Sequence, residues 1–161
     1  MPDNPAALIL DFGGVVTRTL FETHALTGET LGLSPGRLTW RGPFDPGDDE
    51  LWQSMQRDEI SERDYWLERT RQVSHMIGQN WTAMTDFVKA ARGASPEKII
   101  RPEFYATLDR VSQTGIRLAI LSNELDLFCG AEFRSKLPFL KQFDVIEDAT
   151  YTNRLKPDSA A

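Results

Sequence analysis

The apolar residues of the chain are arranged in two ways, and the difference predicts where strands and helices lie. Three short runs, 8–10, 116–121 and 143–146, consist mainly of consecutive apolar residues, which is typical of strands buried in a sheet. The first run ends abruptly at Asp11 and two glycines, and the second also ends in polar residues. Such residues mark the points where the chain leaves a strand.

Elsewhere the apolar residues recur at the spacing of helices. The clearest helix is predicted over 102–114, because Pro102 suits a first helical turn and Gly115 follows as a stop. Ser61, with Asp64 on the same first turn, resembles a capping box that begins another helix. Further helical spacing occurs over 17–33, 51–55, 65–77, 81–91 and 125–137.

A helix followed by a strand, as in 102–121, is half of a parallel crossover unit. The sequence therefore predicts an α/β protein. Segments 1–16 and 93–161 are expected to form a core around a parallel sheet. Segment 17–92 is expected to form a helical lobe inserted after the first strand.

The charge balance restricts the possible partners. The chain of 161 residues has 24 acidic and 18 basic side chains, a net charge of -6 and a pI of about 4.9. This balance argues against a nucleic-acid partner, because phosphate backbones are bound through clustered positive charge. The length suits one domain, or a small core with an inserted lobe.

Cysteine content and the length of apolar runs predict the compartment. Cys129 is the single cysteine and has no partner for an internal disulfide, which indicates a reducing environment. Residues 1–5 lack the features of a secretory signal, and no run approaches the ~18 apolar residues of a membrane span. We therefore expect a cytoplasmic protein without a membrane partner.

Asp11 is the first candidate for chemistry. Ligands of open α/β sheets bind at the carboxyl ends of the strands, where side chains and loop N–H groups converge. The glycines that follow Asp11 allow the loop N–H groups to face an anion, and a carboxylate beside such a loop suits a nucleophile or a metal ligand. The alternative is a plain strand followed by a turn, since Asp and Gly are also turn residues.

Three features in a fixed order resemble the haloacid dehalogenase-like superfamily. They are Asp11 after the first strand, Ser122 and Asn123 after the second strand, and Lys156 in a later Lys-Pro-Asp segment. The helical lobe between the first two features matches that family's cap domain. The resemblance implies a Rossmann-like parallel sheet with an inserted helical cap, and it extends over nearly the whole chain.

The resemblance also implies a reaction, a Mg²⁺-dependent hydrolysis of a small phosphorylated metabolite. In it Asp11 attacks phosphorus and forms an aspartyl-phosphate, and Lys156, which alone would be a solvated surface lysine, is the second catalytic residue. The implied substrate-binding groups are the Phe12 and Gly13 amides, the Ser122 hydroxyl and Asn123, which steadies the loop or meets the substrate. The implied metal ligands are the Asp11 carboxylate and the Gly13 carbonyl.

The chain departs from the family's pattern at two points. Gly13 stands where the phosphatases of this family have a second aspartate as general acid. The chain also stops at Ala161, before the acidic motif that holds Mg²⁺ in the family, so we expect a member truncated before its last motif. Four acidic residues of the chain are possible replacements for that motif, and nothing in their spacing selects one of them: Asp144, Glu147, Asp148 and Asp158.

Two other functions stay open at this point. One is a catalytically silent remnant or binding module of the same fold, and the other is a metal-independent 2-haloacid dehalogenase in which Asp11 attacks carbon. Loss of the last motif would leave the strand over 8–12 at an open sheet edge, so we expect self-association or marginal stability. Three aromatic residues could line a substrate pocket or belong to the core: Trp40, Phe44 and Trp66.

Overall fold

The computed structural model describes residues 6–92, 96–123 and 125–159. The chain forms two compact units, which we call the sheet unit (Met1–Thr19 with Ser95–Ala161) and the helical unit (Leu20–Ala94). Helices and a three-stranded parallel sheet occur together in the sheet unit, which is compatible with the predicted α/β class. The domain boundary predicted at residue 93 lies outside the described residues.

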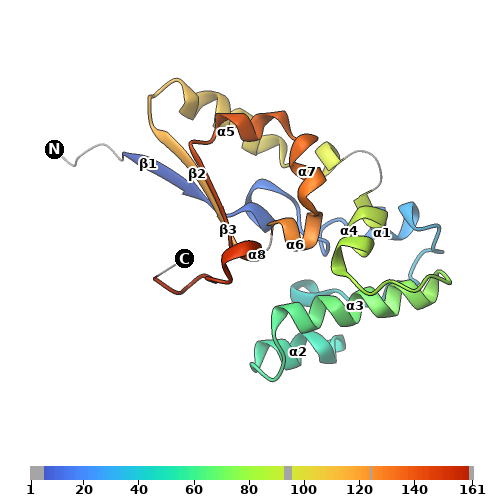
Figure 1. The fold of residues 1–161 in the computed structure, drawn as a ribbon. Coiled ribbons are helices and arrows are strands. Elements are labelled where there is room, and N and C mark those ends of the chain that lie inside the picture. Colours follow the sequence, from blue (N-terminus) through green and yellow to red (C-terminus); the bar gives the residue numbers. More distant parts are fainter. Residues whose placement is uncertain (1–5, 93–95, 124, 160–161) are drawn as a thin grey trace. The chain divides into compact units, whose positions relative to one another are not determined.

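The sheet has the strand order β1-β2-β3 (Figure 1). Its strands are β1 (Ala7–Leu10), β2 (Arg117–Ser122) and β3 (Val145–Asp148), and both strand pairs are parallel. Among the described residues, β1 is therefore an edge strand. The start predicted for the third strand, residue 143, is wrong. β3 begins after Asp144, whose carboxylate accepts a hydrogen bond from the Leu118 N–H (3.0 Å).

One face of the sheet forms the core with α5 (Pro102–Ser112), the helix that precedes β2. α5 begins at Pro102 as predicted and contributes Phe104 and Leu108 to this core. The strands contribute alternate residues to the same cluster, as the period of a strand requires: Leu8, Leu10, Leu118, Ile120 and Ile146.

The single helix predicted over 125–137 is wrong. The chain forms two short helices there, α6 (Leu125–Cys129) and α7 (Ala131–Ser135). Gly130 separates them with a φ of 77°, a left-handed conformation that a continuous helix does not allow. The 3₁₀ turn η5 (Pro138–Gln142) then leads to β3, and α8 (Ala149–Thr152) follows that strand.

The chain leaves and re-enters the sheet unit at neighbouring points. Thr17 forms an antiparallel bridge with Ile100, directly after the 3₁₀ turn η4 (Pro96–Ile99). Beside it, the Arg18 N–H donates to the Ile99 carbonyl (2.7 Å). These bonds hold the two ends of the inserted segment together within the sheet unit.

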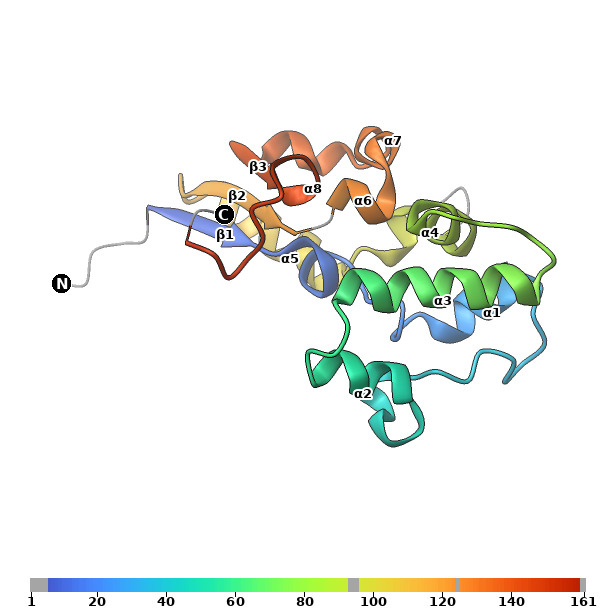
Figure 2. The same cartoon turned by 60° about the horizontal axis from the view of Figure 1, so that its bottom comes forward.

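The helical unit contains α1 (His24–Thr30), η2 (Gly42–Phe44), η3 (Pro46–Asp48), α2 (Glu50–Gln56), α3 (Glu62–Met76) and α4 (Met84–Arg92) (Figure 2). The capping box of Ser61 and Asp64 at the start of α3 is confirmed. α4 begins later than the predicted residue 81, because the Trp81 N–H donates instead to the Ser74 hydroxyl (2.7 Å). Within the described ranges, no helix has the length and apolar character to cross a membrane.

Aromatic side chains fill the interior of the helical unit. Phe21 lies 5.2 to 6.2 Å, between ring centroids, from each of four other rings: Trp40, Trp52, Tyr65 and Trp66. Trp40 and Trp66 are thus core residues, whereas Phe44 is 58% exposed. Of the two roles expected for these aromatic residues, a substrate pocket or the core, the two tryptophans have the second.

Candidate functional site

The predicted site residues of the sheet unit gather at the carboxyl end of the sheet. Asp11 directly follows β1, Ser122 ends β2 and Asn123 follows it. The ladder pairs Leu10 with Ile120, and the strands are parallel. The residues that follow these two positions therefore leave the sheet at the same edge, where ligands of such sheets bind.

A tight turn, η1 (Phe12–Val16), carries the chain away from Asp11. The Thr17 N–H closes it by donating to the Phe12 carbonyl (3.1 Å), and Gly14 takes a φ of 79° that only glycine adopts readily. Gly13 has φ -68° and ψ 124°, and a Cβ atom there would meet nothing within 4 Å. The turn therefore leaves open space at Gly13.

Arg101 fixes the conformation of this turn. Its Nε and Nη2 atoms donate to the Gly14 carbonyl at 3.2 and 3.0 Å. Charge-assisted bonds of this kind are stronger than neutral ones. The role of Arg101 is not apparent from the sequence, because 87 residues separate it from Gly14 and no local pattern connects them.

Asp11 presents its carboxylate beside a cation. Its Oδ1 atom accepts a hydrogen bond from the Phe12 N–H (2.7 Å) and lies 2.9 Å from the Lys156 Nζ. The Asp11 side chain is 45% exposed. The carboxylate is therefore oriented by two donors and is still accessible to a ligand from solvent.

Asn123 positions the segment that carries Lys156. Its Oδ1 atom accepts from the Lys156 N–H (2.7 Å), and its Nδ2 atom donates to the Lys156 carbonyl (3.3 Å). Of the two roles considered for Asn123, these contacts match the one that steadies the loop. The structure thus brings Asp11, Asn123 and Lys156 together.

Ser122 differs from the other predicted site residues in its exposure. It ends β2 on the buried side of the strand and is 5% exposed. Its position at the end of the strand agrees with the sequence prediction, but its hydroxyl lies in a buried environment rather than at the surface where Asp11 stands.

The four acidic residues considered as further metal ligands are not equivalent. Asp144 precedes β3 and so lies at the opposite end of the sheet from Asp11. Asp148 ends β3, but its carboxylate is bound by the Arg134 guanidinium (2.7 Å) and by the N–H groups of Asp126 (2.9 Å) and Thr150 (3.0 Å). Among the described residues, no group of three or more His, Cys, Asp or Glu side chains could hold a metal ion.

Asp148 has a structural role that its protonation state reflects. Burial alone would raise the pKa of its carboxyl, but the hydrogen bonds from Thr150, Asp126 and Arg134 more than offset this effect and lower the pKa. Arg134 also binds Asp126 (2.9 Å), so α6, α7 and β3 are tied together by one charged cluster. No local sequence pattern indicates this cluster, since its members come from separate elements.

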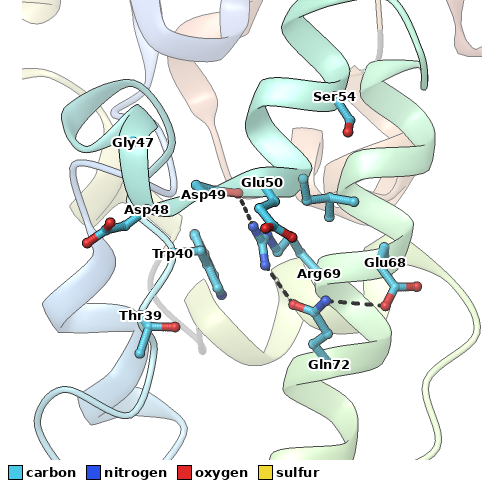
Figure 3. Close-up of a pocket in the computed structure, with 11 residues that line it drawn as sticks. Thr39, Trp40, Gly47, Asp48, Asp49, Glu50, Ser54, Glu68, Arg69 and Gln72 are labelled. Atoms are coloured by element: carbon cyan, nitrogen blue, oxygen red, sulfur yellow. Dashed lines mark hydrogen bonds and ion pairs between the residues drawn. The ribbon is translucent and has the colours of Figure 1, made fainter.

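The helical unit contains an open pocket of about 790 Å³ next to a buried ion pair (Figure 3). Arg69 from α3 pairs with the Asp49 carboxylate and donates to Gln72 (2.7 Å). Asp49 also accepts from the N–H groups of Trp52 (2.8 Å) and Gly42 (3.2 Å). The cluster connects α2, α3 and the loop before α2.

The aromatic residues around this ion pair explain its burial. The Arg69 guanidinium lies 5.6 Å from the Trp40 ring centroid and 5.0 Å from that of Tyr65. The Arg69 Nε and Trp40 Nε1 atoms have no hydrogen-bond partner among the described residues, and both are buried away from solvent. Asp48, Glu50 and Glu68 also line the pocket. The arrangement stabilises the interior of the helical unit, and the predicted phosphate-binding residues lie in the sheet unit instead.

Comparisons with known proteins identify no family for this chain: no family model matches it, and a search of curated proteins finds no match.

Proposed function

We propose that this chain is a haloacid dehalogenase-like hydrolase, a Mg²⁺-dependent phosphatase of a small phosphorylated metabolite. In this proposal the sheet unit is its Rossmann-like core and the helical unit is its cap. One observation carries the proposal: the exposed Asp11 carboxylate follows β1 directly and lies 2.9 Å from the Lys156 ammonium. Phosphoryl transfer through a covalent intermediate uses such a pair, a carboxylate nucleophile with a cation that neutralises phosphate charge.

The proposed reaction has two steps. A carboxylate oxygen of Asp11 attacks phosphorus, the bond to the leaving alkoxide breaks, and the alkoxide takes a proton from water. Water then attacks the aspartyl-phosphate, and inorganic phosphate leaves as Asp11 is restored. In both steps Lys156 would neutralise charge on the phosphoryl oxygens, and the Gly13 amide would donate a hydrogen bond to them. The Phe12 amide, which donates to Asp11, would orient the nucleophile.

The residues present fit Mg²⁺ in part. The accessible Asp11 carboxylate and the Gly13 carbonyl would supply two oxygen ligands. Mg²⁺ in proteins is usually held by one or two carboxylates, with water and substrate phosphate completing its six ligands. When bound, the ion would neutralise phosphate charge and align the substrate with Asp11.

Hydrolysis of an aryl phosphate with Mg²⁺ tests this function in the full chain. We expect Asp11→Asn to abolish activity and Lys156→Met to lower it by about a hundredfold or more, since each removes a group that acts in the transition state. Asp109→Asn and Lys136→Met, at exposed positions of the sheet unit, are the matched controls. Acid-quenched mass spectrometry should detect a phosphoryl group on Asp11 during turnover.

The same assay separates the alternatives. A folded protein that neither hydrolyses phosphates nor becomes phosphorylated would be the silent module. Release of halide from a 2-haloacid in the presence of a chelator would identify the metal-independent dehalogenase. Either result would reject the phosphatase.

A further inference from the structure

The two faces of the sheet differ in what covers them. The face formed by Leu8, Leu10, Leu118, Ile120 and Ile146 belongs to the core. The residues that alternate with them point to the other face, and the ladder aligns Ile9, Ala119 and Val145 in one row across the three strands. We call this row, with Leu121, the open face.

The open face is apolar and accessible. Ile9 is 62% exposed and Val145 is 55% exposed, at the two ends of the row. None of the four side chains belongs to the core cluster of the sheet unit. Parallel sheets are normally covered on both faces, because their strands are apolar on both sides. Covering this exposed row would therefore lower the free energy of the molecule in water.

Two charged residues frame the apolar row at opposite ends of the strands. Arg117 begins β2, two positions before Ala119, and is exposed. Glu147 stands two positions after Val145 on β3 and is partly exposed. In the part of the chain that the structure describes, neither charged group has an ion-pair or hydrogen-bond partner. Because Ala119 and Val145 are paired, the two charges lie about 13 Å apart along the strand direction.

We propose that the open face binds the open face of a second copy of this chain. A two-fold axis between the sheets, perpendicular to the strands, makes the strands of the two copies antiparallel. The apolar rows then face each other, and Arg117 lies near Glu147 of the partner subunit at both ends. Charge complementarity favours this arrangement over the other possible one. With the two-fold axis along the strands, the strands of the two copies would be parallel, and the two Arg117 side chains would lie close together and repel each other. The inference does not depend on the proposed function.

The size of the surface predicts a weak dimer. An interface centred on four apolar side chains falls in the class of transient contacts, which bury less than about 1,200 Å². We therefore expect a reversible monomer–dimer equilibrium that shifts with protein concentration, measured by sedimentation velocity on the full chain.

Charge reversal tests the geometry of the dimer. Arg117→Glu and Glu147→Arg should each weaken dimerisation by at least about tenfold, since each places like charges together at both ends. An equimolar mixture of the two variants should dimerise again, because every contact in the mixed dimer pairs opposite charges. Arg110→Glu, at an exposed position of α5, is the matched control and should leave the equilibrium unchanged.

Several outcomes would overturn the proposal. One is a chain that stays monomeric at every accessible concentration. Others are a dimer that persists in Val145→Asp, or single variants whose mixture does not recover. Circular dichroism of each variant separates loss of dimerisation from loss of folding, and recovery in the mixture requires that both variants are folded.

Discussion

Gly13 determines whether the proposed site has a general acid. Its φ and ψ angles are accessible to any residue, and the space beyond its Cα is open. An aspartate therefore fits there without backbone strain, next to the nucleophile on the same turn. The glycine limits the chemistry of the site, while the conformation of the turn does not require it.

We expect Gly13→Asp to raise kcat by about tenfold or more on alkyl phosphates, whose leaving groups need a proton. On aryl phosphates, which leave without protonation, the change should be small. Gly13→Asn is the isosteric control without an acid. An equal effect of the two substitutions on both substrate classes would show that the added side chain acts by packing.

Asn123 binds the backbone of Lys156 through both polar atoms of its amide. Asn123→Ala removes both hydrogen bonds to that residue, at 2.7 and 3.3 Å. We expect kcat to fall by about tenfold to a hundredfold, because a misplaced group loses its alignment with the reacting atoms, while the melting temperature changes little. Gln142→Ala, an exposed amide in the sheet unit, should leave kinetics unchanged. A change in KM alone would assign Asn123 to substrate binding.

At the scale of elements, the sequence predicts those helices, strands and caps that residues close together in the chain determine. The strands over β1 and β2, the start of α5 at Pro102 and the capping box of Ser61 follow from short patterns. The single helix over 125–137 fails because one left-handed glycine interrupts an otherwise helical spacing. The resemblance carried by the ordered motifs predicts that Asp11, Asn123 and Lys156 belong to one site, whereas Arg101 and Arg134 act through tertiary contacts that no spacing encodes.

The buried ion pair of Arg69 and Asp49 should be the strongest polar link between helices of the helical unit. We expect Arg69→Ala to lower the free energy of unfolding by about 3–5 kcal/mol, because it leaves the buried Asp49 carboxylate without its cation. Arg71→Ala, on the same helix, breaks only an exposed pair with Glu68 (3.5 Å) and should cost less than about 1 kcal/mol. Urea denaturation compares the two. Similar losses would show that the Asp49 hydrogen bonds suffice without Arg69.

At the scale of the whole molecule, the two units report separately on their stability. All four tryptophans lie in the helical unit, so tryptophan fluorescence follows that unit, while circular dichroism follows both. Comparing the two signals therefore shows whether a substitution changes the stability of the helical unit or of the sheet unit.

Tyr65 predicts how the helical unit responds to alkaline pH. Burial raises the pKa of its hydroxyl from 10.0 to about 12. Between these values the unfolded chain releases the proton and the folded chain keeps it, so stability falls as pH rises, by up to about 3 kcal/mol. Fluorescence-detected denaturation from pH 9 to 12 should show this loss, and Tyr65→Phe should remove it. An unchanged slope in Tyr65→Phe would assign the effect to other groups.

The bridge between Thr17 and Ile100 has a consequence for chain entropy. It holds both ends of the inserted segment together. In the folding of the sheet unit, the helical unit therefore counts as one loop whose two ends are joined. The entropy of closing a loop grows only with the logarithm of its length, by about 0.6 kcal/mol for each doubling. A short glycine-serine linker in place of 20–94 should therefore cost the sheet unit little, and insertions of very different sizes could occupy the same point during evolution.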